Sequence, residues 1–218
     1  MALEDATLDE IRDALAGDVA ANAAFDGWGE AAVAAAAGAR GVDADVARLA
    51  FPGGAVDMID AWFASIDAAM LGRLSPERLA AMKIRERITA LVEARIDLVA
   101  PNREALRRAF AVLAQPQNLP RAAKLAWRAA DVMWRAAGDT ATDYNHYTKR
   151  TILAGVYGAT MQVFLDDESD GFADTAAFLS RRIDGIMRFE KAKAGFLART
   201  EHRPSLSRFI GRLRYRIG

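Results

Sequence analysis

The chain has 218 residues, 52% of them hydrophobic, and its basic and acidic side chains are equal in number. That length allows one large domain, or a small domain fused to a larger one. The absence of cysteine excludes a disulfide framework and a thiolate metal site. The neutral total hides an uneven distribution, because residues 1–60 carry a net charge of −9 and residues 181–218 carry +8.

The first ten residues are acidic and resemble neither a secretory signal nor an arginine-rich mitochondrial presequence. We therefore expect a protein of the bacterial cytoplasm, peripheral to the inner membrane, or a mature organellar form on the matrix side of mitochondria. The longest uncharged helical stretch, residues 151–165, is shorter than a membrane span. It is typical of a buried helix.

Alanine and leucine are abundant, and glycine or proline interrupts the pattern every 10–25 residues, which predicts helices throughout. We expect an all-α bundle of about nine to ten helices. The expected ranges are 7–24, 29–38, 43–50, 54–72, 76–99, 102–114, 120–137, 143–165, 172–193 and 204–217. The predicted division is an N-terminal three-helix subdomain (1–53), a helical core (54–200) and a C-terminal amphipathic tail (201–218).

The layout of residues 11–63 resembles the N-terminal helix-turn-helix module of TetR-type repressors. In such a module the short third helix enters the major groove of DNA. Here that helix carries Asp43 and Asp45 beside a single Arg48, so repulsion from phosphate opposes DNA binding. The sequence favours a structural bundle with no nucleic-acid partner. A TetR-type transcriptional regulator remains the alternative function.

The expected helix over residues 143–165 is apolar on all sides and has charges only at Lys149 and Arg150 after its start. Such a helix lies at the centre of a bundle or lines an apolar cavity. On the preceding helix, Trp127 and Trp134 are seven residues apart and can share one face. Periodicity leaves core and cavity open.

Residues 131–150 contain Met133-Trp134, Ala137-Gly138-Asp139, Thr142-Asp143-Tyr144-Asn145 and Tyr147-Thr148-Lys149-Arg150. This block resembles the signature of the lipid-binding accessory protein of ubiquinone (coenzyme Q) biosynthesis, ninth in the Coq series. The resemblance implies a TetR-like fold that holds an isoprenoid or quinone lipid and presents it to the demethoxyubiquinone hydroxylase. The residues assigned to lipid binding are Trp134, Tyr157, Met161 and Phe164.

The resemblance also implies a surface for that hydroxylase at the start of the 143–165 helix. Aromatic and polar side chains together at a helix end are typical of a protein interface. The family often has tryptophan at the position of His146. In the alternative, Asp143 caps the helix and the tyrosines pack on the preceding helix. The candidate interface residues are Met133, Tyr144, His146, Tyr147 and Arg150. By analogy with TetR-like folds, we expect a homodimer.

The expected helix 204–217 is basic and amphipathic. This pattern indicates an interfacial membrane helix, and the family resemblance implies the same; docking of the apolar side onto the domain core is the alternative. The apolar side chains occupy an arc of about 100°, with two arginines on the opposite side. The apolar residues are Leu206, Phe209, Ile210, Leu213 and Ile217, and the two arginines are Arg208 and Arg212.

The sequence offers little for catalysis. Its two histidines, His146 and His202, are far apart, and neither follows a Glu-x-x-His pattern. There is no glycine-rich phosphate loop, and no serine stands beside an evident base. The acidic run 166–171 lacks the closing glutamate of a calcium loop, so we expect a solvated turn. We therefore predict an accessory protein that is not an enzyme and has no cofactor or metal.

Overall fold

The computed structural model describes residues 6–140 and 144–201, without the side chains of 144, 145, 187 and 189–201. Within these ranges the chain forms α-helices and short 3₁₀ turns and no β-strand, which confirms the predicted all-α class. The chain divides into two compact units, residues 1–179 and 180–218. The predicted membrane helix 204–217 lies outside the described residues, so its seven assigned residues stay a prediction.

The first three helices are α1 (Leu8–Asp26), α2 (Glu30–Arg40) and α3 (Ala44–Leu49). Thr7 and Glu10 form a capping box that begins α1, and the Asp43 carboxylate accepts from the backbone amides of Asp45 and Val46 in α3. We call these three helices the head, and Trp28 attaches the head to the helices that follow. Its indole Nε1 donates to the Ala105 carbonyl at 3.0 Å, and its ring lies 5.5 Å from that of Trp62.

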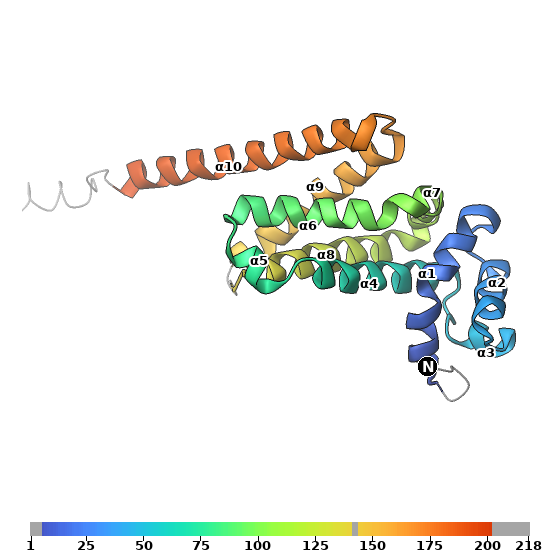
Figure 1. Cartoon of the computed structure of the whole chain (residues 1–218). Helices are drawn as coiled ribbons and strands as arrows, with labels where there is room; N and C mark the ends of the chain where they lie inside the picture. The colour runs from blue at the N-terminus through green and yellow to red at the C-terminus, as the bar shows by residue number, and fades with distance from the viewer. Residues whose placement is uncertain (1–5, 141–143, 202–218) are drawn as a thin grey trace, which may run out of the picture. The chain divides into compact units, whose positions relative to one another are not determined.

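The bundle comprises α4 to α9 with the start of α10, and Figure 1 shows α4, α6 and α8 side by side. The head packs at the α7 end, and α5 lies at the other end (Figure 1). The predicted boundary at residue 53 falls in the turn between α3 and α4. The helix bounds are α4 Ala55–Arg73, α5 Pro76–Ala80, α6 Ile84–Val99, α7 Arg103–Leu113, α8 Leu119–Ala136, α9 Tyr144–Asp166 and α10 Ala173–Glu201.

The single helix predicted over 76–99 is wrong, because the chain breaks between α5 and α6. Ser75 caps α5 ahead of Pro76, and α6 begins anew where the Glu86 carboxylate accepts from the Lys83 amide at 2.9 Å. The Arg87 guanidinium then donates to the carbonyls of Ala80, Met82 and Ala137. It thereby joins this break to the turn after α8.

The acidic run between α9 and α10 contains a buried helix cap. Asp166, Glu168 and Asp170 are exposed, as expected of a solvated turn, but Asp167 is buried. One Asp167 oxygen accepts from the Ser169 amide and hydroxyl, and the other accepts from the Thr175 amide and hydroxyl. Both oxygens are therefore used to begin α10. Among the described residues, no group of three or more acidic or histidine side chains is placed to hold a metal ion.

Replacing Asp167 by asparagine is expected to destabilise the protein by about 2 kcal/mol, because an amide cannot accept from all four donors. Burial alone would raise the Asp167 pKa, but the hydrogen bonds from Ser169 and Thr175 hold it well below its ordinary value. The carboxylate therefore stabilises the fold above the pKa of the unfolded chain, about 3.9, and less as the pH falls below it. Denaturant unfolding of both proteins at pH 7 and pH 3 should show the difference shrinking in acid; an equal difference at both pH values contradicts this role.

Within the described ranges, no helix combines the length and the hydropathy needed to cross a membrane.

Candidate functional site

Three aromatic side chains from α8 and α9 meet at the surface. The Trp127 ring on α8 lies 6.0 Å from Tyr147 and 6.5 Å from His146 on α9, and the His146 and Tyr147 rings are 5.1 Å apart. Tyr147 is 61% exposed, whereas Trp127 and His146 are half-buried. We call Trp127, His146 and Tyr147 the aromatic surface. Half-buried aromatic groups around an exposed tyrosine are typical of a protein-binding surface.

A buried ion-pair cluster lies one turn further along α9. The Arg150 side chain is 1% exposed, and its guanidinium contacts Asp131 on α8 at 2.5 Å and Asp139 after α8 at 3.0 Å. It also donates to the His146 carbonyl at 3.1 Å. Lys149 completes the cluster with an ammonium 2.7 Å from Asp139. The α8–α9 connection is therefore fastened to the helix that carries His146 and Tyr147.

The charges in this cluster keep both aspartates ionised. Burial alone raises the pKa of Asp139, but hydrogen bonds from Lys149 and Arg150 bring it below its ordinary value. The pKa of Asp131 is likewise lowered against burial, first by its hydrogen bond from Arg150 and then by the charge of Arg135. At neutral pH the cluster is a set of paired ions.

The five predicted interface residues fall into three groups. His146 and Tyr147 lie at the surface, while the side chain of Tyr144 is outside the described residues. Met133 and Arg150 are buried, with 0% and 1% exposure. Their side chains are covered in this conformation, and their role at an interface stays a prediction.

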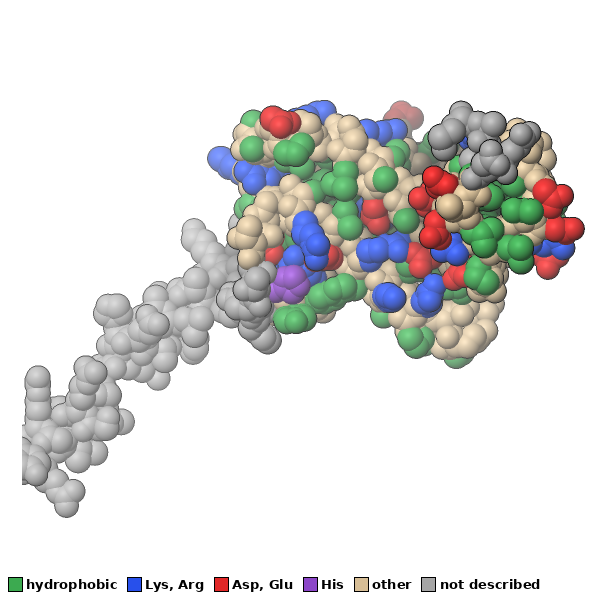
Figure 2. Space-filling view, turned by 90° about the horizontal axis from the view of Figure 1, so that it is seen from below, with side chains coloured by type: hydrophobic (Ala, Val, Ile, Leu, Met, Phe, Trp, Pro, Cys, Tyr) green, Lys and Arg blue, Asp and Glu red, His purple; other side chains and the backbone are tan. Residues whose placement is uncertain are grey.

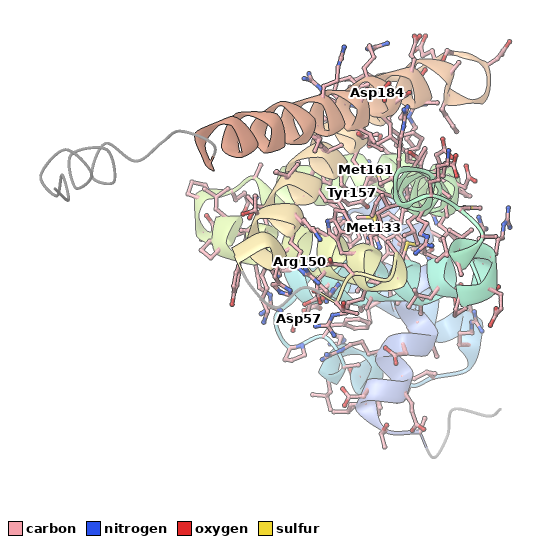
Figure 3. All side chains as sticks on the ribbon, turned by 90° about the vertical axis from the view of Figure 1, so that its left-hand side faces the viewer. Asp57, Met133, Arg150, Tyr157, Met161 and Asp184 are labelled. Carbon is pink, nitrogen blue, oxygen red and sulfur yellow. The ribbon has the colours of Figure 1, made fainter. Side chains whose placement is uncertain are left out.

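The four predicted lipid-binding residues do not meet at one point. Trp134 is on α8 and contacts the first turns of α9, where its Nε1 donates to the Lys149 carbonyl at 3.0 Å. Phe164 is fifteen residues beyond Lys149, which corresponds to about 22 Å along the helix. Met161 and Phe164 are 1% and 0% exposed. Figure 3 shows Tyr157 and Met161 near Met133, and Tyr157 is half-buried. These residues therefore follow the length of α9 instead of enclosing one site.

Tyr157 belongs to a buried polar group that the sequence analysis missed. Its hydroxyl accepts from Arg95 Nε at 3.0 Å, and the Arg95 guanidinium pairs with Asp67 on α4. Arg95 is 1% exposed and Asp67 is 7% exposed. The signal was present, because Arg95 interrupts an apolar stripe at helical spacing formed by Leu91, Val92, Ile96 and Val99.

A second set of ion pairs joins α4 to α8 near the surface. The Arg128 guanidinium pairs with Asp60 and lies 3.4 Å from Asp67, and Arg121 lies 2.9 Å from Asp57. Figure 2 shows acidic and basic side chains next to one another across this face. Most of these side chains are half-buried and join α4 to α8, while the pair at the 44% exposed Arg121 adds little stability.

The third helix of the head has an acidic surface. Asp43 and Asp45 are exposed, and the one arginine, Arg48, pairs with Asp45. Val46 and Leu49 are also exposed, at 39% and 63%. A helix that reads the major groove presents cations to the phosphates, and this one presents carboxylates and aliphatic groups.

The fold has a counterpart among solved structures. A TetR transcriptional regulator from Nitrosomonas europaea superposes with a TM-score of 0.64 at 25% sequence identity. The match covers 81% of this chain and 97% of that one. The protein therefore has a TetR-like fold, as predicted.

Residues 119–190, which hold the aromatic surface and the ion-pair cluster, match the sequence model of the COQ9 family. The chain is 43% identical over 96 residues to the mitochondrial ubiquinone biosynthesis protein COQ9 of Rattus norvegicus, and 40% identical over 96 residues to that of Homo sapiens. Each match covers 44% of this chain and about a third of the relative, 31% and 30%. The predicted resemblance is confirmed: residues 119–190 are similar to the COQ9 family, and the chain has a TetR-like fold.

Proposed function

We propose that the protein is a non-catalytic accessory factor of ubiquinone biosynthesis. It binds an isoprenoid quinone precursor and presents it at the membrane to the demethoxyubiquinone hydroxylase. The observation that carries this proposal is the aromatic surface over its buried ion-pair cluster, inside the segment that matches the COQ9 family. Because the matched segment is about a third of each relative, the lipid and the partner are proposals for this chain.

The hydroxylase is proposed to dock on the aromatic surface. Exposed tyrosine with partly buried tryptophan and histidine provides a large contact area with little loss of side-chain entropy. The paired ions below hold the start of α9, so the surface is already formed before binding. Preorganisation of this kind increases affinity because fewer groups are ordered on docking.

Replacing Tyr147 by lysine is expected to weaken hydroxylase binding at least tenfold, a loss typical of a central interface residue. Titration calorimetry with the purified hydroxylase measures it, and circular dichroism confirms that the variant is folded. Phe25→Lys is the matched control, because Phe25 is 82% exposed on the head, away from this surface. Equal affinity of the Tyr147 variant and wild type would remove the interface from the proposal.

The lipid is proposed to lie along α9, against the residues predicted for it. Burial of an isoprenoid tail contributes about 0.8 kcal/mol per CH₂ group removed from water, so a long tail gains much from such a site. Met161 and Met133 can adjust their shapes to an irregular chain. Since Met161 and Phe164 are buried in this conformation, lipid entry requires the helices around them to separate.

The tail 204–217 is proposed to hold the protein on the membrane. Replacing Phe209 by glutamate is expected to abolish flotation with anionic vesicles, because it places a charge inside the apolar arc. Ser207→Glu adds the same charge outside that arc and is expected to retain binding. Unchanged flotation of the Phe209 variant contradicts the proposal. The location that we propose is the inner membrane of a bacterium or the matrix side of the mitochondrial membrane. The relatives are named as mitochondrial proteins.

Two further proposals concern assembly and the alternative function. We propose a homodimer, by analogy with TetR-like folds, which light scattering of the purified protein tests.

The structural counterpart is a TetR regulator, which keeps transcriptional regulation as the alternative. The exposed carboxylates of α3 oppose it, because they repel phosphate.

A further inference from the structure

Four of the exposed aliphatic side chains of the first unit lie in two very different electrostatic settings. Val46 and Leu49 lie on α3 beside the exposed Asp43 and Asp45. Leu71 and Ile84, 45% and 42% exposed, lie where α4 ends and α6 begins, on either side of α5. Residues 71–87, which we call the α5 tip, contain five basic and two acidic side chains.

The cations of the α5 tip are placed around its aliphatic groups. Arg73 follows Leu71 by two residues, Lys83 directly precedes Ile84, and Arg78 lies on α5 between them; all three are exposed. One of the two carboxylates, that of Glu86, accepts from the Lys83 amide and is thus used to begin α6. The tip therefore has a positive outer surface with two exposed aliphatic side chains.

The tip is held rigidly, and it shares an end of the bundle with the aromatic surface. Arg87 donates to Ala80 and Met82 within the tip and to Ala137 in the turn after α8, the last of these at 2.8 Å. Figure 1 shows α5 at the end of the bundle opposite the head. A surface that contacted α5 would lie close to the start of α9 as well.

We propose that the α5 tip is a second membrane contact, which docks on an anionic lipid surface. Lysine and arginine around exposed aliphatic groups suit such a surface, because the cations meet the lipid headgroups while leucine and isoleucine enter the acyl boundary. The acidic head is repelled from the same surface. The contact is separate from the tail 204–217 and from hydroxylase docking. It fixes which end of the bundle faces the lipid.

The absence of cysteine permits a direct test in the full chain. An environment-sensitive fluorophore is attached to Ile84→Cys, and to Leu49→Cys on the head as the matched site. Both are titrated with phosphatidylcholine vesicles with and without phosphatidylglycerol. The expected result is a blue shift at position 84 with the anionic vesicles alone, reversed by added salt, and no shift at position 49. Flotation that brings the labelled protein to the vesicles without a shift at position 84 overturns the proposal.

Charge reversal provides the second measurement. Arg73→Glu/Arg78→Glu/Lys83→Glu in the Ile84→Cys protein is expected to weaken the vesicle-dependent shift by at least tenfold in lipid concentration at low salt. The control Arg40→Glu/Arg48→Glu/Lys124→Glu makes the same change in net charge at exposed sites outside the tip. An equal effect of the two triple variants overturns the proposal. Hydroxylase affinity in solution is expected to stay unchanged, so failure of the tip and failure of the proposed function are distinguishable.

Discussion

Replacing Arg95 by methionine is expected to lower the free energy of unfolding by about 3–5 kcal/mol. Arg95 is 1% exposed, and its removal leaves the buried Asp67 carboxylate without its main partner and the Tyr157 hydroxyl without its donor. The nearest remaining cation, Arg128, has its Nε 3.4 Å from Asp67. A buried charge that loses its partner keeps the full cost of desolvation. Denaturant unfolding monitored by circular dichroism measures the change.

The double variant Asp67→Leu/Arg95→Met distinguishes the effect of losing the ion pair from the effect of leaving the Asp67 carboxylate buried without its partner. It is expected to be more stable than Arg95→Met, because two apolar side chains of suitable size replace an ion pair without leaving either ion buried alone. Arg48→Met is the surface control, since Arg48 is 45% exposed in its pair with Asp45, and it is expected to change stability by less than about 1 kcal/mol. A double variant less stable than Arg95→Met contradicts this explanation.

The second large effect is expected at Arg150. Arg150→Met is expected to cost about 2–4 kcal/mol, less than Arg95→Met, because Asp131 keeps Arg135 at 2.9 Å and Asp139 keeps Lys149 at 2.7 Å. It is also expected to weaken hydroxylase binding, since the guanidinium joins Asp131, Asp139 and the His146 carbonyl. Denaturant unfolding and titration calorimetry below the unfolding transition measure the two effects.

Arg135→Met is the matched control for Arg150. It removes a cation from the same aspartate, but the Arg135 side chain is 72% exposed, so a change of less than about 1 kcal/mol and normal binding are expected. Arg150→Lys keeps the charge but cannot contact both aspartates with a fork of donors, and it is expected to recover part of the loss. If Arg150→Met binds the hydroxylase as wild type does, the cluster does not position the aromatic surface.

The helical fold was predictable from the sequence because its signals are local. Caps, prolines and glycines lie within a few residues of the helix ends that they define, as at Ser75 and Pro76. The break before Ile84 was missed although its local signal, a glutamate three residues into the new helix, is present at Glu86. The continuous helical pattern on both sides outweighed it.

The site was only partly predictable, because its contacts join residues far apart in the chain. Trp127 and Trp134 were placed on one face, and both contact α9, but the spacing did not indicate that Trp127 meets Tyr147 and Trp134 meets Lys149. The burial of Arg150 depends on Asp131, nineteen residues earlier, and no periodicity reports such a pair. The partners of Arg95 are Asp67 and Tyr157, on two other helices. Sequence patterns indicate which face is buried, and not which polar groups meet there.

A quinone profile tests the central proposal most directly. Cells lacking this gene are complemented with wild type, Tyr147→Lys or Phe25→Lys, and their lipids are measured by mass spectrometry. We expect the deletion to accumulate demethoxyubiquinone with little ubiquinone, and we expect wild type and Phe25→Lys, but not Tyr147→Lys, to restore ubiquinone. A normal profile in the deleted cells would contradict the proposal that this protein serves the hydroxylase.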